Sequence, residues 1–132
     1  MAADPQYAAT PATVSAQLTL ANTARDGTGS NIVTVLTAAA TGTRILAIDI
    51  MAQVTTTAGA VRLWIVLDSG PTFRLFDEVL VPAITLSGVT VKPFRQRLDF
   101  TSVPLILSTG YSLRAASNAA EAINVHALAA SL

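Results

Sequence analysis

The sequence predicts an all-β fold, an antiparallel β-sandwich of about eight strands. Short segments that alternate apolar and polar residues recur along the chain, and Gly, Pro and Asp turns separate them. No long segment has the spacing of an amphipathic helix. Eight strands in two sheets of four best fit a jelly-roll-like sandwich. We expect residues 1–12 to form an extended N-terminal arm and residues 13–132 to form one sandwich domain.

The most regular stretch is residues 43–70, which we interpret as two long strands joined by a polar turn over residues 55–59. Before the turn, every even position is apolar: Leu46, Ile48, Ile50, Ala52 and Val54. After the turn, the apolar positions are Val61, Leu63, Ile65 and Leu67. Alternation of this kind indicates strands with one buried face. We predict that the two strands pair as an antiparallel hairpin.

Further strands are predicted on both sides of this pair. Their expected ranges are 14–20, 31–38, 73–81 and 91–100, and 104–107 with 111–115 as a hairpin around residues 108–110. The last stretch, 119–132, is rich in alanine, which suits a helix. Its residues 122–128 nevertheless alternate as in a strand, and no helix cap precedes them. We therefore predict a closing strand there.

The charge of the chain is low and balanced. Only 12% of its residues are charged, and eight basic residues cancel eight acidic ones, whereas an average soluble domain has about 25% charged residues. No net field would attract nucleic acid or an anionic membrane, and no apolar run approaches the roughly 20 residues of a membrane-spanning helix. The N-terminus does not resemble a secretory signal. With 52% hydrophobic residues, we expect an oligomer or lattice component; the alternative is a monomer coated with Thr, Ser, Asn and Gln.

Residue types that carry out chemistry are scarce. The chain has no cysteine and one histidine, His126, where a jelly-roll metal site of the cupin type would need at least two histidines. Asp77 and Glu78 are adjacent in a strand, so their side chains should point to opposite faces. Asp49 lies in an apolar strand and is expected to pair with Arg62 or Arg44. We predict no catalytic residue, no cofactor and no metal, and therefore no enzyme.

Seven of the eight basic residues are arginine, a residue type enriched at protein interfaces. We predict a subunit or capsid interface made of Tyr7, Arg62, Trp64, Arg74, Phe76, Arg95 and Arg97. Tyr7 would anchor the N-terminal arm on a neighbouring subunit; the alternative is that the arm is a free tail.

Three runs of the sequence resemble small structural proteins encoded in the virion gene blocks of tailed bacteriophages. The runs are TGTRILAIDIMAQVTTTAGAVRLWI, FRLFDEVLV and LILSTGYSLRAASNAAEAINVHALA, and the resemblance covers about residues 41–128. It implies a jelly-roll capsid decoration (cement) protein on the capsid exterior, assembled in the host cytoplasm. Its expected partners are itself, as a homotrimer or higher oligomer, and the major capsid protein or another virion protein.

Two other roles stay open at this point. The same resemblance suits a tail, neck or fibre-attachment protein. A receptor- or glycan-binding module would present exposed aromatic residues on its loops, whereas these loops consist of Thr, Gly, Ser and Ala.

Overall fold

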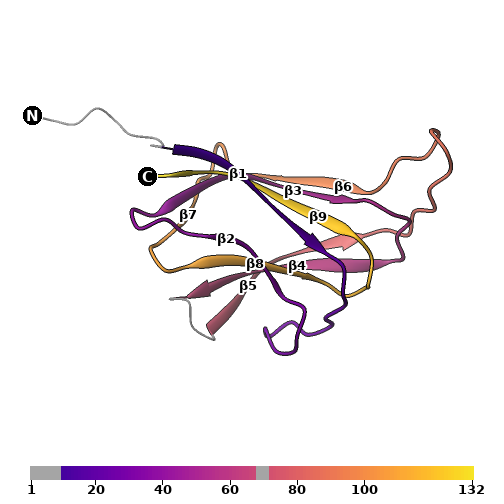
Figure 1. Cartoon of the computed structure of the whole chain (residues 1–132), viewed down its shortest axis with the longest axis horizontal. Helices are drawn as coiled ribbons and strands as arrows, with labels where there is room; N and C mark the ends of the chain where they lie inside the picture. Colours follow the sequence, from indigo (N-terminus) through magenta and orange to yellow (C-terminus); the bar gives the residue numbers. More distant parts are fainter. Residues whose placement is uncertain (1–9, 68–71) are drawn as a thin grey trace, which may run out of the picture.

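The computed structural model describes residues 10–67 and 72–132, which form two antiparallel β-sheets packed face to face (Figure 1). These residues contain no helix. One sheet, sheet A, has the order β1-β9-β3-β6, with β7 also paired to β3, and the other, sheet B, has the order β2-β8-β4-β5. The strands are β1 (Thr10–Leu18), β2 (Val33–Thr37), β3 (Thr43–Ala52), β4 (Gly59–Leu67), β5 (Thr72–Val81), β6 (Arg95–Asp99), β7 (Leu105–Leu107), β8 (Ser112–Ser117) and β9 (Ile123–Ser131). The all-β sandwich predicted from the sequence is confirmed.

The pairings are nested along the chain. β4 pairs with β5, β3 with β6 and β7, β2 with β8, and β1 with β9. The first half of the chain therefore folds back antiparallel on the second half. Two further pairings, β3 with β9 and β4 with β8, join the nested pairs into the two sheets.

The core lies between the sheets and is built from the inward side chains of both layers. Its largest fully buried aliphatic members are Leu18, Ile45, Ile48, Ile50, Leu63, Leu107, Leu113 and Ile123. Outside the bulges, inward and outward residues alternate along the strands because the backbone is pleated. The period-two pattern of the sequence thus identifies the strands correctly.

The predicted hairpin between the two central strands is wrong. β3 lies in sheet A and β4 lies in sheet B, so the segment between them crosses from one sheet to the other. Their apolar faces meet across the core instead of lying side by side. In that segment Thr56 exchanges two backbone hydrogen bonds with Ile84. A buried face produces the same alternation whether its strand pairs with the next strand or packs over it, so periodicity does not distinguish the two arrangements.

The hairpin predicted around residues 108–110 is also wrong, because β7 belongs to sheet A and β8 to sheet B. Gly110, with a φ of 85°, helps to turn the chain between them. Within β3 the register shifts between Ile45 and Ala47. This bulge changes which residues face inward, and Leu46 is half-buried instead of belonging to the core.

The closing strand predicted in residues 119–132 is confirmed. It is β9, which pairs with both β1 and β3 and lies inside sheet A. The other predicted strands are present with shifted ends, and β6 is shorter than the predicted range 91–100. Of the predicted arm, residues 10–12 belong to β1 and pair with β9. The rest of the arm lies outside the described residues.

Candidate interaction surfaces

The loop between β1 and β2, residues 19–32, covers the part of the outer face of sheet B around Trp64. Trp64 points outward from β4 but is 0% exposed, because this loop lies over it. The indole Nε1 donates a hydrogen bond of 2.8 Å to the carbonyl oxygen of Arg25. The ring of Phe73 meets the indole edge-on, with 6.1 Å between the centroids. Trp64 therefore acts as the anchor of the loop.

An ion-pair cluster fastens the same loop next to Trp64. The Oε1 atom of Glu78 accepts a hydrogen bond of 2.8 Å from Arg62 Nε and one of 2.6 Å from Arg25 Nε. The hydrogen bond from Arg62, and then that from Arg25, lowers the pKa of the Glu78 carboxyl. Arg62 is only 6% exposed and also donates to the carbonyl of Thr23. Its charge is thus neutralised inside the chain.

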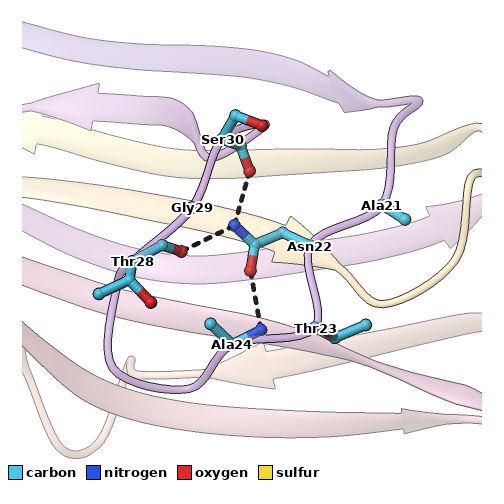
Figure 2. A pocket seen from close by; sticks show the side chains of 7 residues that line it. All are labelled: Ala21, Asn22, Thr23, Ala24, Thr28, Gly29 and Ser30. Carbon is cyan, nitrogen blue, oxygen red and sulfur yellow. Dashed lines mark hydrogen bonds between the residues drawn. The ribbon is translucent and has the colours of Figure 1, made fainter.

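A hollow of about 260 Å³ opens inside this loop, lined by residues 21–24 and 28–30 (Figure 2). The buried side chain of Asn22 crosses it. Its Nδ2 atom donates to the carbonyl oxygens of Thr28 and Ser30, at 3.0 and 2.6 Å, and its Oδ1 atom accepts from Ala24 N at 2.9 Å. Both amide donors and the amide oxygen are engaged. Asn22 therefore holds the two sides of the loop together.

The outer face of sheet A has a different character. In register across it lie Ser15, His126, Asp49 and Arg97, on β1, β9, β3 and β6. Arg97 forms a bidentate pair with Asp49, with Nε–Oδ1 at 2.8 Å and Nη2–Oδ2 at 2.7 Å. The hydrogen bond from Arg97 lowers the pKa of the Asp49 carboxyl, and its charge and those of Arg95 and His126 add to this effect. The cluster forms a fixed ion pair on the outer face of sheet A.

The partner predicted for Asp49 is therefore corrected. It is Arg97, with Arg95 at 3.5 Å, and not Arg62 or Arg44. The prediction assumed that β3 and β4 pair, whereas the neighbour of β3 on this side is β6. Arg62 lies in the other sheet.

Three amide side chains form a second cluster on the outer face of sheet A. Gln17 Nε2 donates to Asn124 Oδ1 at 2.9 Å and to Gln53 Oε1 at 3.0 Å, and Asn124 Nδ2 donates to Gln53 Oε1 at 3.0 Å. Gln17 lies on β1 and Asn124 on β9, and Gln53 directly follows β3. The bonds tie the edge strand β1 to the middle of the sheet.

The segment between β5 and β6, residues 82–94, protrudes from one end of the sandwich (Figure 1). Its tip is a tight turn in which Ser87 and Val91 form an antiparallel bridge. Val89 is fully exposed there and Val91 is partly exposed. Thr55 and Thr56 hold the base of the segment through hydrogen bonds to Leu86, Pro82 and Ile84. The protrusion is an exposed apolar feature on a fixed base.

The seven predicted interface residues are therefore dispersed. Arg95 and Arg97 meet around Asp49 on sheet A, whereas Arg62 and Trp64 meet beneath the loop on sheet B. Arg74 is exposed on β5, and Phe76 is half-buried against Phe100, with 5.8 Å between the ring centroids. Tyr7 lies outside the described residues. An interface role for these residues stays a prediction.

The sequence interpretation missed the exposed valine at the tip of the 82–94 segment. Apolar residues in a loop, here in the run SGVTV, are the signal that identifies such a tip.

Within residues 10–67 and 72–132, no group of three or more His, Cys, Asp or Glu side chains is placed to hold a metal ion. The same residues include no helix that is long and apolar enough to cross a membrane. No protein-family model, curated protein or solved structure matches the chain.

Proposed function

We propose that this chain is a non-enzymatic structural protein of a tailed-phage virion, and specifically a capsid decoration (cement) protein on the exterior of the shell. The observation that most supports this proposal is the nested strand order, in which β1 to β4 pair back antiparallel on β5 to β9 across two sheets. This order supports a jelly-roll winding. Jelly rolls are typical of viral capsid, lectin and cupin domains.

The side chains favour the capsid class among these three. A cupin site needs several metal ligands inside the sandwich, whereas His126 lies on the outer face of sheet A beside Asp49. A sugar site uses exposed aromatic rings, whereas Trp64 is fully buried and Phe73 is covered by Arg114, with 5.4 Å from the guanidinium carbon to the ring centroid. The described surface thus offers a partner polar side chains, a few arginines and scattered exposed apolar side chains, which include Leu80 on β5 and Ile106 on β7.

Such a surface suits a protein that acts through many repeated contacts. Each contact of a weakly charged face is modest, but copies bound next to one another on a shell reinforce each other through multivalency. We propose that the copies contact each other and the major capsid protein or another virion protein. In this arrangement Arg74, Arg95 and Arg97 are accessible for contact, whereas Arg62 and Trp64 act within the chain.

The second candidate is a tail, neck or fibre-attachment protein. The protruding segment with Val89 at its tip favours it, because one projecting apolar loop suits insertion into a single neighbour. The two candidates differ in copy number, since a shell has many equivalent sites and a tail or neck has few.

The experiment is re-addition of the purified chain to phage particles produced without it, followed by measurement of the bound amount per particle. Saturable binding to the shell is expected. The tip variant Val89→Asp should lower the occupancy, whereas Val103→Asp, which alters another exposed valine, should not. The absence of binding to such particles, when the particles that normally contain the chain retain it, would contradict a decoration role.

A second variant, which lacks residues 1–9, tests the arm. It keeps all of β1, so the fold should be intact by far-UV circular dichroism. If the arm with Tyr7 docks on a neighbour, its removal lowers the occupancy. Unchanged occupancy would count against the arm.

A further inference from the structure

The edges of the two sheets differ in how they are protected. An edge strand presents unpaired backbone N–H and C=O groups, which can pair with another chain. Natural sheets avoid such pairing with short edge strands, charged residues, proline or bulges. In this sandwich the edges are β1 and the β6/β7 side in sheet A, and β2 and β5 in sheet B.

Three of these edges carry such protection. β6 has five residues, of which Arg95, Arg97 and Asp99 are charged, and Pro93 precedes it. β2 has five residues and a register shift between Thr34 and Leu36. β5 is long, but its register also shifts, opposite Leu63 and Trp64, and it contains Arg74, Asp77 and Glu78.

β1 is the exception among the described strands. Its nine residues pair with β9 in continuous register, from Thr10 opposite Ser131 to Leu18 opposite Ile123. None of the nine residues is charged, and Pro11 interrupts only the start. Thr13, Ser15 and Gln17 are exposed on the outer face, whereas Val14 and Ala16 turn toward the core. β1 is therefore a long, regular and uncharged free edge.

We propose that β1 pairs antiparallel with β1 of a second copy of this chain, so that the two A sheets become one continuous sheet across a twofold axis. Such a contact is isologous, and identical residues approach each other near the axis. A charged edge would oppose its own copy by like-charge repulsion, whereas β1 brings only hydroxyl, amide and small apolar side chains together. Thr and Ser side chains facing each other across antiparallel strands are favourable pairs.

This inference names the contact between two copies of the proposed virion protein. It rests on the proposed function only where it gives that contact a role in a shell. An isologous contact closes as a dimer. It would be one of two kinds of contact in a larger oligomer of dihedral symmetry, whereas the cyclic homotrimer expected from the sequence resemblance would not use it. The solution measurements below test it without any phage particle.

The first test measures the mass of the full-length chain by light scattering over a range of concentrations. The wild type should form dimers. The double variant Thr13→Lys/Ser15→Lys puts two lysines on the exposed face of each paired β1 strand and should weaken the dimer at least about tenfold. The matched control Thr34→Lys changes an exposed residue of the edge strand β2 and should leave the dimer unchanged.

The second test uses the absence of cysteine from the chain. Single variants Thr13→Cys, Ser15→Cys and Gln17→Cys are oxidised alone and in equimolar mixtures. A disulfide forms only when the two Cα atoms lie within about 7 Å, so the variant or mixture that lies on the axis should yield covalent dimers. Thr34→Cys should not.

A wild-type chain that remains monomeric would overturn the proposal, as would a dimer or trimer that persists in the double lysine variant. Pairing that appears only after removal of residues 1–9 would also overturn it for the full chain, because the chain itself would then cover the edge. A β1-dependent dimer that does not bind phage particles would support the edge contact and refute the proposed function.

Discussion

Replacing Trp64 tests how the covering loop is held to sheet B. The side chain is fully buried, donates its indole hydrogen bond to Arg25 and packs edge-on against Phe73. An aromatic side chain of this kind buries about 150–250 Å², which at about 25 cal/mol per Å² corresponds to roughly 4–6 kcal/mol as an upper estimate. The hydrogen bond adds about 0.5–1.5 kcal/mol.

We therefore expect Trp64→Ala to lower the free energy of unfolding by about 3–5 kcal/mol, in the range seen for large-to-small core changes. This is a large part of the 5–15 kcal/mol typical of a domain. Trp64→Phe keeps an aromatic ring but loses the hydrogen bond and some volume, so about 1–2 kcal/mol is expected. Leu75→Ala is the control, because Leu75 pairs with Trp64 across β4 and β5 but is 44% exposed.

The assay is urea denaturation followed by far-UV circular dichroism, since Trp64 is the sole tryptophan and its fluorescence disappears in the variants. In the wild type the same fluorescence serves as a second probe. Acrylamide should quench the fluorescence of Trp64 far less in the native protein than in the unfolded protein. Hydrogen exchange of amides in residues 22–30 should accelerate in Trp64→Ala. A loss below about 1 kcal/mol, or equal quenching in the folded and unfolded states, would refute the burial of Trp64 beneath the loop.

Three further predictions concern the fixed contacts of the two faces. Asp49→Asn should cost about 0.5–1.5 kcal/mol at pH 7, because the bidentate arginine is half exposed to solvent. Folding lowers the pKa of the Asp49 carboxyl. Its contribution to the free energy of unfolding is therefore complete above the unfolded pKa near 3.9 and is lost as the pH falls through the folded pKa. Urea denaturation at several pH values should show that the free energy of unfolding of the variant depends less on acid pH. Asn22→Ala removes three hydrogen bonds of the loop and should cost about 2–3 kcal/mol, with faster amide exchange in residues 22–30; exchange as slow as in the wild type would contradict this role. Gly27→Ala would place a Cβ against the ring of Phe73 at a φ of 86° and should lower the free energy of unfolding by more than about 2 kcal/mol. Gly88→Ala, at a φ of 51° with no atom nearby, should lower it by about 1 kcal/mol. Equal melting temperatures for the two variants would refute the close packing at Gly27.

The sequence predicts the strands of this fold well but their partners poorly. Alternation reflects one buried face, and it correctly places strands at β2, β5 and β9. Alternation does not show whether the next strand in the chain pairs with this strand in the same sheet or packs opposite it in the other sheet. Both predicted hairpins are wrong for this reason. The bulges in β3 and β5 depend on register with the neighbouring strands, so alternation within one strand does not locate them.

The interface residues illustrate the same limit. Trp64 is predicted to lie at a subunit or capsid interface, but a segment more than thirty residues earlier in the same chain covers it. Glu78 binds Arg62 because β4 and β5 pair, and Asp49 binds Arg97 because β3 and β6 pair. These contacts follow from sheet order, which local sequence patterns do not contain.

The proposed role in the virion is tested most directly by the number of copies of the chain in purified phage particles, measured by quantitative mass spectrometry against the major capsid protein. A decoration protein is expected in a copy number comparable with that of the shell protein. Absence from the particle, or only a few copies per particle, would contradict the capsid role, and the latter result would favour a tail or neck position.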